Sequence, residues 1–127
     1  MKAQPEPASA TLAVELAAVA RDLHAAEAQG QGTHGARTLV REDDLRVVLL
    51  ALAPGGTLAE HHVKDTATIQ VLDGKVRVGI AGRSIELVGG QLLPLERGLV
   101  HDVEALAQST VLLTLAQLPS TQPPPRG

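Results

Sequence analysis

Two segments of this 127-residue chain combine turn glycines with a histidine near the end of a short apolar run. The first segment extends from Gly55 through His61 to Gly74, and the second contains Gly90 and the sequence from Gly98 to His101. Short runs between such turns are typical of β-strands, and many of them separated by glycines indicate an antiparallel sandwich or barrel. The chain is therefore predicted to be all-β over most of its length.

The expected strands begin at Thr38, where the apolar period changes from helical to strand-like. Leu45–Ala53 is nearly continuously apolar, as in a strand that is buried on both faces. Asp73-Gly74 is a strong hairpin signal, and Val76, Val78 and Ile80 then alternate with other residues on one predicted inward face, which Ile85 and Leu87 resume. Further strands are expected over residues 57–63, 67–72, 91–95, 100–104 and 109–118, for a total of eight or nine.

An amphipathic helix is expected before the strands. Leu12, Leu16, Val19 and Leu23 recur at intervals of three and four residues, which predicts about three helical turns that cover one face of the barrel or form a subunit contact. The predicted organisation is a disordered N-terminus (1–10), a helix with a glycine-rich joint (11–37), a barrel (38–118) and a proline-rich disordered tail (119–127).

The composition excludes several classes of function. The chain has no Phe, Tyr, Trp or Cys, so it offers neither aromatic stacking for nucleic acid or sugars nor thiolate chemistry. The net charge of −3 comes without a basic cluster, and nucleic acid is not an expected partner. No apolar span reaches the roughly 18–20 residues of a membrane helix, and a cytoplasmic location is expected.

The two glycine and histidine segments resemble the two motifs of the cupin family in both spacing and residue type. The first motif, G-x5-H-x-H-x3-E-x6-G, falls on Gly55, His61, Val63, Ala67 and Gly74. The second motif, G-x5-P-x-G-x2-H-x3-N, falls on Gly90, Glu96, Gly98, His101 and Ala105. The resemblance covers about residues 45–118 and implies a single cupin-type antiparallel β-barrel (double-stranded β-helix or jelly roll) after the N-terminal helix.

The resemblance also implies where a divalent metal would bind, but here the ligand set is incomplete. Cupins that bind metal supply two His and one Glu from the first motif and one His from the second. His61 and His101 carry over, whereas Val63 and Ala67 replace the other two ligands. His62 is expected to point away from His61 on a regular strand, although a β-bulge could re-aim it. Two alternatives stay open: a metal (Fe, Mn, Ni or Zn) held by His61, His62 and His101, or a facing pair of pocket imidazoles.

Other polar residues are weaker candidates. Gln70 is predicted to add a polar group to the pocket, next to His61 and His101. Glu96 and Arg97, before His101, are interpreted as a surface ion pair or as gatekeepers of the pocket. The remaining polar residues are expected to play no part in the site: Asp43, Asp44 and Asp65 as solvated turn residues, Asp102 on the strand face opposite His101, and His24 and His34 as exposed side chains.

These observations predict a cupin-domain protein, expected to be a homodimer, that binds a small molecule in the barrel pocket, with or without a divalent metal. The alternative is a metal-dependent cupin enzyme of the dioxygenase or isomerase type that uses His61, His62 and His101. The residues do not decide whether the protein is catalytic, and they identify no catalytic residue.

Overall fold

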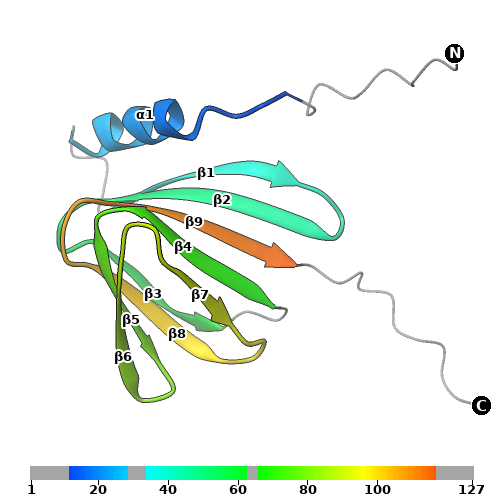
Figure 1. The fold of residues 1–127 in the computed structure, drawn as a ribbon, viewed down its shortest axis with the longest axis vertical. Helices are drawn as coiled ribbons and strands as arrows, with labels where there is room; N and C mark the ends of the chain where they lie inside the picture. The colour runs from blue at the N-terminus through cyan, green and yellow to red at the C-terminus, as the bar shows by residue number, and fades with distance from the viewer. Residues whose placement is uncertain (1–11, 29–33, 63–65, 117–127) are drawn as a thin grey trace, which may run out of the picture.

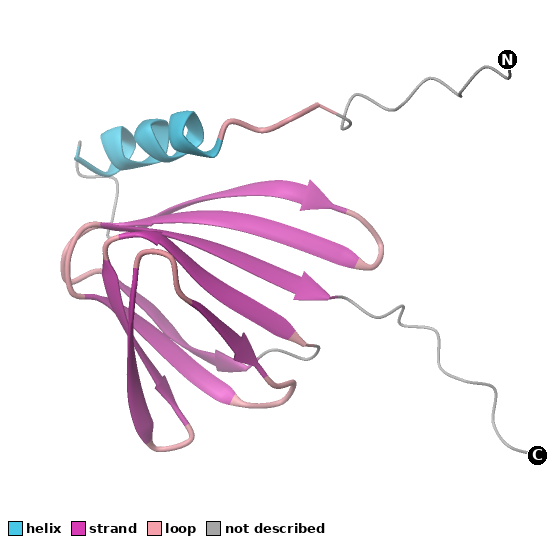
Figure 2. Ribbon diagram, viewed as in Figure 1, coloured by secondary structure: helices cyan, strands magenta, loops and turns pink. Residues whose placement is uncertain are grey.

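The computed structural model describes residues 12–28, 34–62 and 66–116, with the backbone alone for residues 34 and 59–62. Within these residues it contains one helix and nine strands (Figures 1 and 2). Their bounds are α1 Leu16–Ala28, β1 His34–Arg41, β2 Leu45–Leu52, β3 Thr57–His62, β4 Ala67–Asp73, β5 Lys75–Ile80, β6 Arg83–Val88, β7 Leu92–Leu95, β8 Val100–Ala105 and β9 Ser109–Ala116. The ends predicted to be disordered, residues 1–10 and 119–127, lie outside the described residues.

The strands form two sheets that face each other. Sheet A has the strand order β1-β2-β9-β4-β7, and sheet B has the order β3-β8-β5-β6. The strand pairs within both sheets are antiparallel. The predicted all-β fold with an N-terminal helix is confirmed.

The two ends of this barrel differ in how the chain crosses between the sheets. At one end, which we call the closed end, four short connections join sheet A to sheet B: residues 53–56, 74, 89–91 and 106–108. The other end, which we call the barrel mouth, carries the β1–β2 turn (42–44), the β5–β6 turn (81–82) and the β7–β8 connection (96–99). Figure 1 shows the sheets closer together near α1 and farther apart toward the other end.

Aliphatic side chains from both sheets fill the space between them. The inward positions of β5 alternate as predicted, and Val76, Val78 and Ile80 are buried in the main core. Leu87 is buried in the same core and Ile85 packs against it, so the predicted inward face of β6 is also confirmed.

A second, smaller core lies on the outer face of sheet A, where α1 covers it. Leu23 of the helix packs there with Leu49 and Ala51 of β2, whereas Val48 and Leu50 point into the barrel. The strand β2 is therefore apolar on both faces, which explains its nearly continuous apolar sequence.

The predicted start points of the helix and of the first strand need correction. The helix begins at Leu16, and Leu12, expected on its apolar stripe, precedes it and is 76% exposed. The strand β1 begins at His34 rather than at Thr38. The bare backbone of Gly35 lies against Leu23, where a Cβ atom would sit 3.5 Å from Leu23 Cδ2, so the helix packs closely on the start of the strand.

The four motif glycines all have positive φ, as their turn positions require: Gly55, Gly74, Gly90 and Gly98. Gly74 also has no space for a side chain. A Cβ atom there would collide with the Gln108 carbonyl and the Ser109 hydroxyl, and would lie 2.7 Å from Ser109 Cα. The glycines of the sequence motifs are thus fixed by backbone conformation, independently of any chemistry at the histidines.

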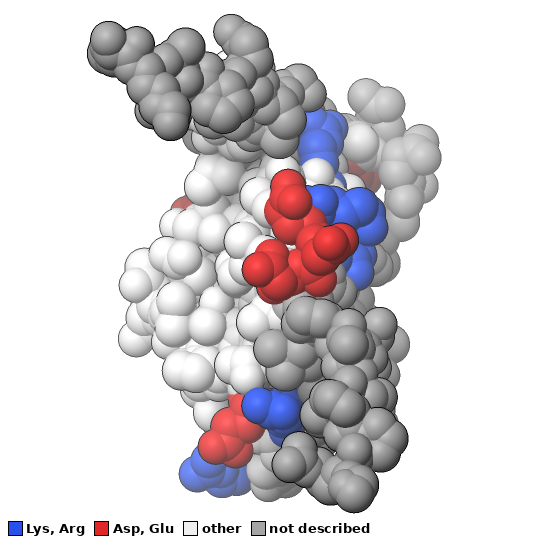
Figure 3. Space-filling model, turned by 90° about the vertical axis from the view of Figure 1, so that its right-hand side faces the viewer, with Lys and Arg blue, Asp and Glu red and all other residues white. Residues whose placement is uncertain are grey.

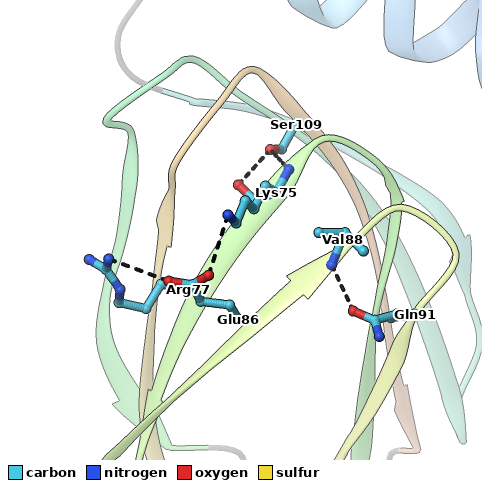
Figure 4. A network of polar contacts seen from close by, with 6 residues as sticks. All are labelled: Lys75, Arg77, Glu86, Val88, Gln91 and Ser109. Carbon is cyan, nitrogen blue, oxygen red and sulfur yellow. Dashed lines mark hydrogen bonds and ion pairs between the residues drawn. The ribbon is translucent and has the colours of Figure 1, made fainter.

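Polar contacts fasten the closed end and the outer face of sheet B (Figure 4). The fully buried hydroxyl of Ser109 accepts a hydrogen bond from Lys75 N at 3.0 Å and donates one to Ala107 O at 2.8 Å. On the outer face, Glu86 lies 3.4 Å from Lys75 Nζ and 3.7 Å from Arg77 Nη2. Exposed ion pairs of this kind add little to the stability of the fold, so the buried hydrogen bonds of Ser109 contribute more.

Candidate functional site

His101 lies on the inward side of β8, at the barrel mouth. It is 3% exposed and alternates with Val103 and Ala105, which are buried in the main core. Its Nδ1 atom is 3.5 Å from the Leu99 carbonyl oxygen, a long contact. As predicted, Asp102 points to the outer face, where its carboxylate accepts a hydrogen bond from Gly79 N at 3.2 Å.

A β-bulge in β3 decides which first-motif histidine is paired with His101. Leu58 pairs with Val103, and the next pair is His61 with His101, so residues 59 and 60 together oppose the single residue Asp102. In an unbroken register, residue 60 would stand opposite His101. The bulge therefore moves His61 into register with His101.

His62 occupies a different register position. It pairs with Val100, whose side chain is 47% exposed on the outer side of β8. The bulge lies before His61, and the pairing of His61 and then His62 with successive residues of β8 is regular again after it. The register thus gives His61, rather than His62, the place across from His101.

The other motif positions supply no metal ligand. Ala67 is buried at the start of β4, in register with Leu95 and Leu115, and presents only a methyl group to the barrel interior. Val63 lies outside the described residues. Among residues whose side chains the structure describes, no three His, Asp or Glu side chains come together as a metal-ligand set. The described residues therefore do not fit a metal held by three or four side chains.

Gln70 does not face the barrel interior, contrary to the prediction. Ile69 and Val71, on either side of it, are buried in the main core, so Gln70 points to the outer face of sheet A. It pairs there with Leu112, which packs against the core beneath α1. The prediction failed because β4 is partly buried on both faces, which hides the parity of its inward residues.

Two arginines missed by the sequence reasoning lie at the barrel mouth. Arg46 is two residues before the inward-facing Val48 on β2, and it pairs with Leu115, which packs against the main core. Arg46 is half-buried, and its Nε atom is fully buried without a hydrogen-bond partner in the described part of the chain. Arg41 stands directly opposite Arg46 on β1, after a register shift between Thr38 and Val40.

Both sheets bring polar groups to this end of the barrel. The inward row of sheet A at the mouth is Arg41, Arg46, Leu115, Ala67 and Leu95, and the inward row of sheet B contains Ile80, His101 and the register position of His61. The mouth therefore combines the half-buried Arg46 and the exposed Arg41, whose Nη2 atom lies 3.5 Å from Thr38 Oγ1, on one sheet with the buried imidazole of His101 on the other.

The acidic residues that lie between the two arginines in sequence are exposed. Asp43 and Asp44 lie in the β1–β2 turn as solvated residues, as predicted. Figure 3 views the side of the molecule where that turn lies in Figure 1, and shows acidic and basic side chains next to one another. Glu96 and Arg97 are exposed too, and the ion pairs found among the described residues do not include them. Charges that water screens in this way offset the buried Nε of Arg46 only weakly.

His24 is not exposed, contrary to the prediction. It is half-buried on α1, and its Nε2 atom is hydrogen-bonded to Thr110 Oγ1 at 2.9 Å. The partners are 86 residues apart in sequence, so no local pattern could have indicated this contact. His34 lies in β1 rather than in a joint.

No described helix is long and apolar enough to cross a membrane.

Comparison with known proteins finds similarity in structure only. No family model and no curated protein matches the sequence. A conserved protein of unknown function from Streptococcus pyogenes has a TM-score of 0.66 at 23% identity, over 71% of this chain and 79% of that one. A cupin superfamily protein from Desulfitobacterium hafniense has a TM-score of 0.64 at 17% identity, over 65% and 76% of the two chains. A variant of oxalate decarboxylase from Bacillus subtilis has a TM-score of 0.61 at 26% identity, over 68% of this chain and 26% of that one.

Proposed function

Since this chain is a cupin-fold protein, we propose that it binds a small anion, such as a carboxylate, at the barrel mouth. The observation that carries the proposal is the pair of arginines on the inward side of sheet A, Arg41 and Arg46, the second with a buried Nε that lacks a partner. His101 on sheet B, with His61 opposite it in register, would contact the other side of the ligand.

The arginine pair favours an anion on electrostatic grounds. Like charges directly opposite each other on neighbouring antiparallel strands destabilise the pair. A buried guanidinium nitrogen without a hydrogen-bond acceptor adds a further unfavourable term. A carboxylate between the two groups would offset both effects, because guanidinium groups bind carboxylates through two parallel hydrogen bonds.

The rest of the mouth favours a small ligand with an aliphatic part. Leu95, Leu115 and Ile80 occupy the inward positions beside the charged groups. A few polar groups that fix the orientation of a ligand, within an otherwise apolar lining, are typical of small-molecule sites. The similarity to an oxalate decarboxylase makes small dicarboxylates suitable first probes.

The test is binding of oxalate and malonate, measured by thermal shift and calorimetry at constant ionic strength. We expect saturable stabilisation that is lost in Arg46→Met and retained in the matched control Arg37→Gln. Arg37 is exposed and pairs with Leu49 on the outer face of sheet A. The control substitution therefore also removes one positive charge, but outside the barrel mouth. Equal loss of binding in both variants would show that net charge, rather than the site, attracts the anion, and would contradict the proposal.

A second candidate is the metal-dependent enzyme of the dioxygenase or isomerase type, favoured by the register pairing of His61 with His101. These two residues supply only two ligands, and no step through a metal follows from the described side chains. Elemental analysis of protein purified without a chelator or affinity tag tests this candidate. Near-stoichiometric Fe, Mn, Ni or Zn, lost in His61→Ala and in His101→Ala, would support it. Metal-free protein that divalent ions do not stabilise would eliminate it.

A further inference from the structure

A cavity lies outside the barrel, between α1 and the closed end of sheet A. It has a volume of about 580 Å³. A smaller cavity of about 180 Å³ adjoins the C-terminal part of α1 and is lined by Glu27, Ala53 and Pro54. His24 and Gln108 line both spaces, which we therefore treat as one helix-side site.

The wall of this site is polar on the side of the sheet and apolar along much of the helix. Thr110, which is 4% exposed, holds His24 at 2.9 Å, and Asp73 and Gln108 add an exposed carboxylate and amide. The helix contributes the small side chains Ala17 and Ala20 to the larger cavity. The site is thus a hollow between the helix and the sheet, in which His24 is held by Thr110.

Glu27 is the unexplained group at this site. Its residue is 9% exposed, and both carboxylate oxygens are fully buried without a hydrogen-bond partner in the described part of the chain. Burying a carboxylate without a donor is unfavourable, and native proteins leave few such groups unsatisfied. A ligand that donates N–H groups would satisfy Glu27.

We infer that the helix-side site binds a small aliphatic ammonium compound, whose N–H groups are accepted by Glu27. The chain has no Phe, Tyr or Trp, so the site lacks the rings that usually bind cations, and a carboxylate is its strongest acceptor for an ammonium group. Glu27 lines the smaller cavity, and its carboxylate would have to turn toward a ligand bound there, because both of its oxygens are fully buried.

The charges around the site orient the ligand. Arg21 lines the larger cavity and is exposed, and it disfavours an ammonium group beside it. It lies six residues before Glu27 on the helix, about 9 Å along the axis. Asp73 also lines the larger cavity, but its carboxylate is exposed, whereas the carboxylate oxygens of Glu27 are buried and unpartnered. The ammonium group is therefore placed toward Glu27, and the aliphatic part toward the apolar side chains of the larger cavity.

This site is independent of the anion site proposed at the barrel mouth. Its unpartnered buried group is an acid rather than a base, and it lies on the outer face of sheet A. Arg46→Met should therefore abolish anion binding and leave ammonium binding unchanged. Glu27→Gln should abolish ammonium binding and leave anion binding unchanged.

The experiment measures the melting temperature of the full chain against n-butylammonium chloride. Potassium chloride, tetramethylammonium chloride and sodium butyrate serve as controls for ionic strength, for a cation without N–H donors and for an anion of the same chain length. We expect butylammonium alone to stabilise the protein, by about 4 °C at tenfold excess over its Kd. Stabilisation by tetramethylammonium to the same extent, or by butyrate instead, would overturn the inference.

Two variants locate the effect. Glu27→Gln should remove the stabilisation by butylammonium and raise the melting temperature of the free protein, because a buried amide is less unfavourable than a buried charge. Asp22→Asn is the matched control, an exposed acid on the same helix, and should bind as the unmodified chain does. Unchanged binding in Glu27→Gln would refute the assignment, even if butylammonium binds.

Discussion

The two ends of the barrel differ in the charge and the position of their unpartnered polar groups. At the closed end the Ser109 hydroxyl forms hydrogen bonds with Lys75 N and Ala107 O, and the unpartnered acid, Glu27, lies on α1, outside the sheet. At the mouth the unpartnered group is basic, Arg46, and lies on the inner side of the same sheet. The two unpartnered groups, which have opposite charge, therefore lie on opposite faces and at opposite ends of sheet A.

This comparison shows why a sheet that is apolar on both faces can support two unrelated sites. The inner core is shared with sheet B, whereas the outer core depends on α1 alone. A change in the inner core should affect the whole barrel, while a change beneath α1 should affect mainly the helix and its site.

The largest effect is expected from truncating one leucine in each core, which tests whether the inner and outer cores are independent. Leu52→Ala, at a fully buried inner position, should lower the free energy of unfolding by about 3–5 kcal/mol, and Leu23→Ala on the helix by about 2 kcal/mol. Denaturant unfolding measures both. Amide hydrogen exchange should then show that Leu23→Ala accelerates exchange in α1 alone. Equal acceleration throughout both sheets would mean that the helix and the barrel unfold as one unit.

An intermediate effect is expected from the hydrogen bond that ties α1 to the sheet. Thr110→Val removes the partner of His24 and should lower the free energy of unfolding by about 1 kcal/mol. It should also weaken binding of butylammonium without changing binding of oxalate. Thr114→Val, four residues further along the same strand, is the control for replacing a hydroxyl with a methyl group on that face. A loss of oxalate binding in Thr110→Val would break the separation between the sites.

The smallest effect concerns the charges at the mouth. Arg41→Gln relieves the repulsion from Arg46 and should stabilise the ligand-free protein by roughly 0.5 kcal/mol at low salt. The gain should shrink at 1 M salt, where the screening length is about 3 Å. Chemical denaturation with urea at two salt concentrations, with Arg37→Gln alongside, measures it. A salt-independent change would indicate a packing effect instead of electrostatics.

The sequence by itself determined the features that depend on local rules. Positive φ at Gly55, Gly74, Gly90 and Gly98 follows from turn chemistry, and the inward faces of β5 and β6 follow from the period of two. The parity of His101 and Asp102 was predictable for the same reason. These rules, together with the resemblance of the motifs, were sufficient for the fold.

Only the tertiary structure decided which polar groups meet. The bulge before His61, the inward position of Arg46 and the outward position of Gln70 depend on pairing with strands far away in sequence, and an alternation read along one strand does not show which face is covered. The burial of Glu27 and the contact of His24 with Thr110 depend on where α1 docks. Local periodicity fixes the strands, whereas the sites arise from long-range packing, which the local sequence pattern does not encode.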